Sequence, residues 1–219
     1  MNLENYSANN KVYLTGEVLT TPKYSHELYG EGFYEFFVSV PRLSGQRDEL
    51  PVTVSERLML GTDLTVGNKV TIDGQFRSYN KLENEKSKLM LTIFVRDFLE
   101  NDEDEQNPNV VELNGYVCKP PVYRTTPFNR EICDLLVAVN RGYNKSDYIP
   151  CIAWGRNARF VRHACVGQSI SISGRIQSRK YNKKLDDDRV EERTAYELSV
   201  NKITCDYVAD ETASTTDDE

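Results

Sequence analysis

The chain has 219 residues, of which 39% are hydrophobic, and its 34 acidic and 27 basic side chains give a formal net charge of −7. This length suits one large or two small domains, and no apolar run reaches the roughly 18 residues that a membrane-spanning helix needs. The first residues also lack the basic start and apolar segment of a secretory signal. We therefore expect a cytoplasmic protein without membrane contact.

Alternating apolar segments, separated by Gly, Pro and polar residues, predict five strands in each half of the chain. The strands expected in chain order cover residues 10–18, 33–41, 50–54, 68–79 and 88–98, then 109–118, 131–140, 147–154, 168–181 and 193–203. A short helix is expected between the third and fourth strand of each half, at 55–61 and 155–165, where Ala158, Val161 and Cys165 form an apolar stripe. We interpret the intervening segments 24–32, 80–86, 120–129 and 182–192 as loops. Five strands with a helix after the third is the arrangement of the OB-fold barrel.

The two halves repeat each other in register. Val12-Tyr-Leu-Thr-Gly16 matches Val111-Glu-Leu-Asn-Gly115, and residues 36–42 match residues 135–141, each ending in arginine. Gly67 and Gly167 are 100 residues apart. We therefore predict an all-β protein with two tandem OB-fold barrels, at residues 1–100 and 109–208, joined by an acidic linker at 101–108 and followed by a disordered acidic tail at 209–219.

Charge is divided unevenly between these segments. Residues 1–100 carry 11 basic and 14 acidic side chains, whereas residues 109–208 carry 16 basic and 11 acidic ones. The linker and the tail contain only acidic charges. A basic module therefore lies between acidic segments, and the tail either solubilises the chain, competes with phosphate or binds basic partners.

The most informative stretch is residues 168–181. Ile170, Ile172 and Ile176 alternate with polar residues, which predicts a long strand with one buried face. Its other face carries Arg175, Arg179 and Tyr181. An aromatic ring among cations can stack on a base and hold phosphate, as binding of a single-stranded nucleic acid requires. A solvated strand face is the alternative interpretation.

The second half also resembles a known family. The motifs are Leu113-Asn-Gly115, Leu136-Val-Ala-Val-Asn-Arg141, Tyr148-Ile-Pro-Cys-Ile-Ala-Trp-Gly155 and the whole of residues 166–181. In order and spacing they resemble the bacterial single-stranded DNA-binding protein family over most of residues 109–203. The resemblance implies OB-fold barrels that coat single-stranded DNA in replication, recombination or repair. The family usually assembles four barrels, so a chain with two implies a homodimer.

The same resemblance implies site residues. The family's stacking aromatics fall on Tyr143, Tyr148, Trp154 and Tyr181. Basic residues near them, expected to contact phosphate or bases, are Arg141, Arg156, Arg175, Arg179, Lys180, Lys183 and Lys184. For Trp154, an ordinary core position is the alternative.

The first half departs from the family pattern. Ser44 or a neighbour, Glu49 and Ser55 stand where the second half has Tyr143, Tyr148 and Trp154, and only Tyr79, near Arg77, is kept as a strand aromatic. We expect this barrel mainly to serve structure or partner contacts, with weak DNA binding as the alternative. The acidic tail is a candidate site for replication or repair proteins, although it ends in Asp-Asp-Glu219 where the family commonly ends in Pro-Phe.

Catalytic motifs are not evident. His26 and His163 lie in no metal-ligand or nucleophile motif, and Asp186-Asp-Asp188 is typical of a solvated turn. The widely spaced cysteines, which we expect to be small buried side chains, predict neither disulfides nor a zinc site: Cys118, Cys133, Cys151, Cys165 and Cys205. We predict a binding protein without cofactor or metal. The alternatives are a primosome-like OB-fold adaptor that acts through protein contacts, and an RNA-binding barrel.

Overall fold

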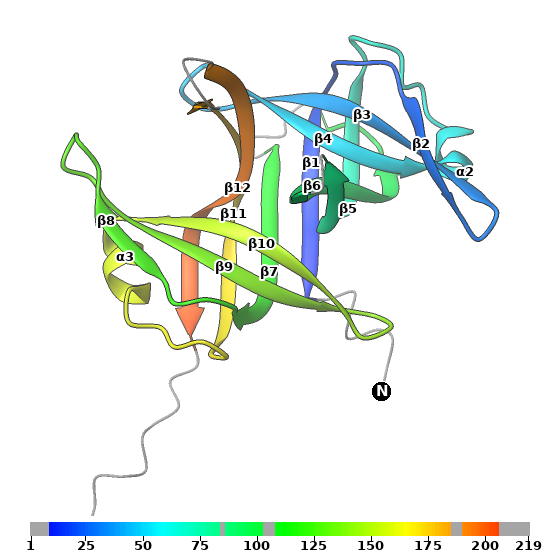
Figure 1. Cartoon of the computed structure of the whole chain (residues 1–219). Coiled ribbons are helices and arrows are strands. Elements are labelled where there is room, and N and C mark those ends of the chain that lie inside the picture. Colours follow the sequence, from blue (N-terminus) through cyan, green and yellow to red (C-terminus); the bar gives the residue numbers. More distant parts are fainter. Residues whose placement is uncertain (1–8, 84–85, 103–107, 185–189, 206–219) are drawn as a thin grey trace, which may run out of the picture.

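Two sets of strands, one from each half of the chain, build the molecule (Figure 1). The computed structural model describes residues 9–83, 86–102, 108–184 and 190–205. The strands of the first half are β1 (Asn10–Val18), β2 (Lys23–Leu28), β3 (Glu31–Pro41), β4 (Arg47–Ser55), β5 (Lys69–Glu83) and β6 (Lys86–Leu99). Those of the second half are β7 (Asn109–Val117), β8 (Val122–Thr125), β9 (Glu131–Arg141), β10 (Lys145–Trp154), β11 (Ser169–Lys184) and β12 (Val190–Cys205). The all-β class and the two tandem OB-fold barrels are confirmed.

The helices lie where the sequence predicts them but are shorter. α2 covers Glu56–Met59 and α3 covers Arg156–Val161, each between the third and fourth barrel strands of its half. Ala158 and Val161 are buried as expected, whereas Cys165 lies beyond the helix and is exposed. The apolar stripe therefore ends at Val161, and the expectation that Cys165 is buried was wrong.

Two segments expected to be loops contain strands. All six residues of β2 are exposed, yet β2 pairs with β3, and β8 pairs with β9 in the same way. These edge strands are held by backbone pairing and bury little, so hydrophobic alternation could not reveal them. Strands also reach into the expected loops at 80–86 and 182–192, because β5 pairs with β6 as far as Glu83↔Lys86 and β11 pairs with β12 as far as Lys184↔Val190.

The two barrels share one sheet. β1 pairs antiparallel with β7 from Asn10↔Leu113 to Leu14↔Asn109, and Val12↔Val111 lies at the centre of this register. Val12 and Val111 occupy the same position of the sequence repeat, so the barrels are related by a local two-fold axis through this pair. The sheet order β2-β3-β4-β6-β5-β1-β7-β11-β12-β10-β9-β8 consequently continues from one barrel into the other.

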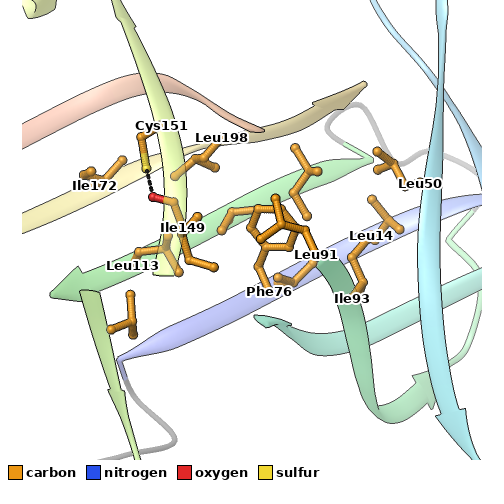
Figure 2. Close-up of a cluster of buried hydrophobic side chains, with 14 of the residues drawn as sticks. Leu14, Leu50, Phe76, Leu91, Ile93, Leu113, Ile149, Cys151, Ile172 and Leu198 are labelled. Carbon is orange, nitrogen blue, oxygen red and sulfur yellow. Dashed lines mark hydrogen bonds between the residues drawn. The ribbon is translucent and has the colours of Figure 1, made fainter. Parts of the chain in front are cut away.

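The core follows the sheet across both halves. Leu14, Phe76, Leu113 and Ile149 are almost completely buried and belong to one hydrophobic cluster, as Figure 2 shows. Burial at the remaining cysteines is graded, with Cys133 and Cys151 buried and Cys118 and Cys205 partly so. Within the described ranges, the acidic, histidine and cysteine side chains form no group of three or more that could hold a metal ion. In the same ranges, every helix is too short to cross a membrane.

The repeated glycines mark the places where strands cross closely. At Gly115, a Cβ atom would lie 2.4 Å from the carbonyl oxygen of Ala138 and 2.9 Å from Val137 Cγ1. At Gly16, its counterpart in the first half, a Cβ atom would lie 2.5 Å from Val38 Cγ1 and 2.7 Å from the carbonyl oxygen of Ser39. A side chain at either position would force β1 from β3, or β7 from β9, where each pair closes its barrel.

We expect Gly115→Ala to lower the free energy of unfolding by about 1–3 kcal/mol, because the added methyl group overpacks this crossing. Urea unfolding, followed by circular dichroism, measures the change. Gly142→Ala is the matched control, since its Cβ would meet no atom within 4 Å. Equal stability of the two variants would contradict the steric role of Gly115.

Candidate nucleic-acid interface

Two predicted aromatics lie on the outer face of β10. Tyr148 and Trp154 are six residues apart on one strand, so the strand's alternation places them on the same side. Their exposed fractions are 41% and 37%, respectively. Trp154 is therefore half-exposed rather than a core residue, and its ring has a surface available for stacking.

An open groove runs beside Trp154, which we call the Trp154 groove. Four arginines line it, against one carboxylate, Glu197. Arg175 and Arg179 are predicted site residues, whereas Arg42 and Arg124 were missed by the sequence reasoning. The signal for Arg42 was present, because it occupies the same repeat position as Arg141. Sequence reasoning assigned it to the other barrel and did not expect it to reach this groove.

A second groove crosses from one barrel to the other, which we call the Tyr79 groove. The first barrel contributes Tyr79 and Leu89, and the second contributes Tyr148, Arg141 and Lys145. The structure thus brings three predicted residues from different barrels, Tyr79, Tyr148 and Arg141, to one surface. The sequence did not foresee this meeting, because it depends on how the two barrels are docked.

The other predicted residues lie outside both grooves. Tyr181 is 37% exposed on the projecting part of β11, with the Arg179 guanidinium 5.8 Å from its ring centre. Tyr143 is 93% exposed in the turn between β9 and β10 and has a positive φ of 62°. Three of the predicted basic residues are exposed, namely Arg156 on α3 and Lys180 and Lys183 on β11, while the side chain of Lys184 is outside the described residues.

Arg77 differs from the rest because it packs inward. Its guanidinium lies 3.7 Å from the centre of the Phe94 ring and donates hydrogen bonds to Gln75. Burial lowers the pKa of Arg77 to about 10. These contacts, both within the first barrel, favour a role in packing over direct contact with a ligand.

Buried carboxylates join the barrels at two related places. Asp48 of β4 accepts hydrogen bonds from Arg42 of its own barrel and from the backbone N–H and hydroxyl of Ser178 on β11. Asp147 of β10 accepts a hydrogen bond from the Ser78 N–H on β5 at 2.8 Å. The two sites correspond in the repeat, so each barrel forms hydrogen bonds with the equivalent long strand of the other, β11 or β5.

Arginines balance both carboxylates. Asp48 also contacts Arg175, at 3.3 Å, and Asp147 contacts Arg141, at 3.4 Å. Hydrogen bonding to Asp48 raises the pKa of Arg42, whereas burial raises the pKa of Asp147 despite the Ser78 N–H and the nearby arginines. Asp147 is thus the less well compensated of the two acids.

The neighbouring strand positions show how the first barrel has diverged. The backbone N–H of Tyr148 donates to the Ser78 hydroxyl, and that of Glu49 donates to the Ser178 hydroxyl. Tyr148 and Glu49 therefore occupy matching positions, as the repeat predicts. Ser55, which stands opposite Phe33 as Trp154 stands opposite Ile132, is buried. The first barrel thus has no tryptophan-like platform at this position.

Comparison with known proteins identifies relatives of the second barrel in particular. Residues 108–206 match the model of the single-strand binding protein family. The chain is 37% identical over 83 residues to single-stranded DNA-binding protein 1 of Clostridium acetobutylicum, covering 33% of this chain and 74% of that relative. It is 32% identical over 107 residues to a Staphylococcus aureus protein of the same name, covering 46% of this chain and 59% of that relative.

Structural comparison extends over both barrels. The single-stranded DNA binding protein from Thermus aquaticus aligns with a TM-score of 0.66, covering 94% of this chain and 96% of that chain. Sequence identity in this alignment is 20%, so the likeness concerns the fold. The chain spans about three fifths of the length of the staphylococcal relatives it matches.

We expect Asp147→Ala to lower the free energy of unfolding by about 3 kcal/mol, because it leaves Arg141 without its buried counter-charge and the Ser78 N–H without an acceptor. Chemical denaturation measures the effect. Asp134→Ala is the control, since Asp134 forms an exposed pair with Arg124 and should contribute no more than about 1 kcal/mol. Similar losses in both variants would show that the contact between the barrels is not held by Asp147.

Proposed function

We propose that this chain, which belongs to the single-strand binding protein family, binds single-stranded DNA with little dependence on base sequence, in replication, recombination or repair. The observation that carries the proposal is the Trp154 groove, where a half-exposed indole lies among four arginines. Stacking is tolerant of sequence because every base has a π-face, and guanidinium groups bind phosphate through paired donors.

The mechanism we propose is passive binding without a chemical step. Each base that stacks on an aromatic side chain contributes roughly 1–3 kcal/mol. Arginine and lysine contacts with phosphate release counterions, so affinity falls as salt rises. The β11–β12 hairpin would contact the DNA strand beside the Trp154 groove through Arg179, Lys180 and Tyr181. Each barrel would cover on the order of 4–16 nucleotides.

We propose that the first barrel takes part through the Tyr79 groove. Tyr79 and Leu89 offer apolar surface, while the cations of this groove, Arg141 and Lys145, come from the second barrel. A DNA strand that binds in this groove contacts both barrels. This arrangement favours weak DNA binding by the first barrel over a purely structural role, and it fits a division into barrels at residues 1–100 and 109–208.

A protein-binding adaptor is the second candidate function. The first barrel exposes large apolar side chains, among them Tyr29, Leu43 and Leu60, and has more acidic than basic residues. Such a surface suits protein partners better than phosphate. The acidic tail, which lies outside the described residues, is a further proposed contact for replication or repair proteins.

The test is a fluorescence titration with a dT oligomer of about 35 nucleotides, at low and high salt. Trp154 is the only tryptophan, so the signal reports on its groove. We expect saturable quenching that weakens with salt and is not competed by duplex DNA. A titration with an RNA oligomer of the same length tests whether the protein prefers DNA to RNA. No binding at low salt would leave the adaptor function.

We expect the double variant Trp154→Ala with Tyr181→Ala to bind dT at least about 2 kcal/mol more weakly, because two stacking surfaces are lost. Fluorescence anisotropy of a labelled oligomer measures affinity once the tryptophan is gone. Tyr29→Ala, which removes a fully exposed ring from the first barrel, should bind as the wild type does. Unchanged affinity in a folded double variant would show that Trp154 and Tyr181 do not form the DNA-binding site.

We also propose a homodimer, which would place four barrels in one assembly. We expect sedimentation equilibrium to yield twice the chain mass of 25.1 kDa. Sedimentation at the monomer mass over the micromolar range would exclude the dimer while leaving the binding function intact.

A further inference from the structure

The free edge of β11 is completed by side chains in place of a strand. β7 pairs with β11 as far as Val111↔Gly174. At the next rung the side-chain amide of Asn109 bonds both backbone groups of Ile176, donating to its carbonyl at 2.7 Å and accepting from its N–H at 2.9 Å. One rung further, the partners come from the first barrel. The N–H of Ser178 donates to Asp48 Oδ1 at 2.6 Å, and Arg42 Nη2 donates to the Ser178 carbonyl at 2.9 Å.

Asp48 and Arg42 are themselves fixed. Arg42 donates from both Nε and Nη2 to the two carboxylate oxygens of Asp48, so the pair is two-pronged. The Asp48 side chain is 1% exposed, and it also accepts hydrogen bonds from Arg175 and the Ser178 hydroxyl. A carboxylate buried with this many donors is rigidly oriented. Because these contacts occupy most donors of Arg42, it is better placed to hold protein backbone than to bind phosphate.

Asp48 and Arg42 bond Ser178 at the point where β11 leaves the barrel. Gln177, Ser178 and Arg179 all line the Trp154 groove. Beyond them, β11 continues as the projecting hairpin that carries Lys180 and Tyr181, and β12 is its pairing partner there. A two-stranded ribbon is only marginally stable alone, so its direction depends on what holds its base.

We propose that Asp48 and Arg42 of the first barrel are positioning residues for single-strand binding by the second barrel. They bond both backbone groups of Ser178 and thereby set the direction in which the β11–β12 hairpin leaves the groove. The inference rests on the proposed function and assigns the first barrel a task within it. The groove and its hairpin are preorganised only while the first barrel is docked, and preorganisation lowers the entropy lost on binding.

The test uses full-length Arg42→Gln and Arg42→Lys with dT of about 35 nucleotides, and Arg47→Gln as the control. Arg47 lies on the same barrel, bonds Ser39 and Glu17, and does not line the Trp154 groove, so its loss changes the net charge equally. Thermal unfolding identifies a temperature at which every variant is folded, and Trp154 quenching at that temperature measures affinity. Amide hydrogen exchange at residues 178–181 reports on the hairpin directly.

We expect Arg42→Gln to bind about tenfold more weakly than Arg47→Gln, because the hairpin must be ordered at the moment of binding. Arg42→Lys keeps the charge but cannot span Asp48 and the Ser178 carbonyl together, so it should also bind more weakly. Both should exchange amide protons faster at residues 178–181. A merely structural role would lower the melting temperature and leave affinity and hairpin exchange unchanged.

Two results overturn the inference. One is an affinity of Arg42→Lys equal to that of the wild type, and the other is unchanged hydrogen exchange in both Arg42 variants. If Arg42→Gln does not fold, Arg42→Lys alone decides. Absence of dT binding by the wild-type chain is a different outcome, because it removes the proposed function together with this inference.

Discussion

The antiparallel pairing of β1 with β7 is the contact on which the molecule depends. It centres on Val12 and Val111, two equivalent residues, and so sets the barrels on either side of a local two-fold axis. Backbone hydrogen bonding joins the two barrels in one continuous sheet, and one hydrophobic cluster extends across both. Both grooves take residues from the two halves, so they depend on how this pairing, together with the Asp48 and Asp147 contacts, docks the halves.

Polar side chains bond the backbone of β5 and β11 at successive distances from the two-fold axis. Asn10 and Asn109 bond the backbone of Phe76 and Ile176, and Asp147 and Asp48 bond the backbone of Ser78 and Ser178 one rung further out. Buried carboxylates are costly unless their oxygens are hydrogen-bonded. Asp48 accepts from arginine and backbone donors through both oxygens, whereas Asp147 accepts from the Ser78 N–H and Arg141 through Oδ1. The outcome is orientation more than stability, since the hairpins that leave the barrels start from these rungs.

The fold could be predicted from the sequence because barrel strands bury one face and repeat every 100 residues or so, as at Gly67 and Gly167. β2 and β8 could not, since exposed edge strands leave no apolar alternation. At the site, strand period placed Tyr148 and Trp154 on the same side of one strand, while their role as stacking residues was implied by the family resemblance. The presence of Arg42 in the Trp154 groove could not be predicted in this way. It depends on how the two barrels are docked, and periodicity within one barrel carries no information about docking. The inward packing of Arg77 was hidden for another reason: its partner Phe94 lies on β6, and the sequence did not show which side chains of β5 and β6 meet.

Joining the halves in one polypeptide releases them from symmetry. In an assembly of identical subunits, any substitution near the axis appears twice, and both copies must tolerate it. Here Gln75 accepts from Arg77 in one half, whereas Gln177 accepts from Arg175 in the other, so the same pair of side chains stands in opposite order. A symmetric dimer cannot adopt that pattern. Covalent tandem arrangement thus permits one half to specialise while its twin keeps the shared architecture intact.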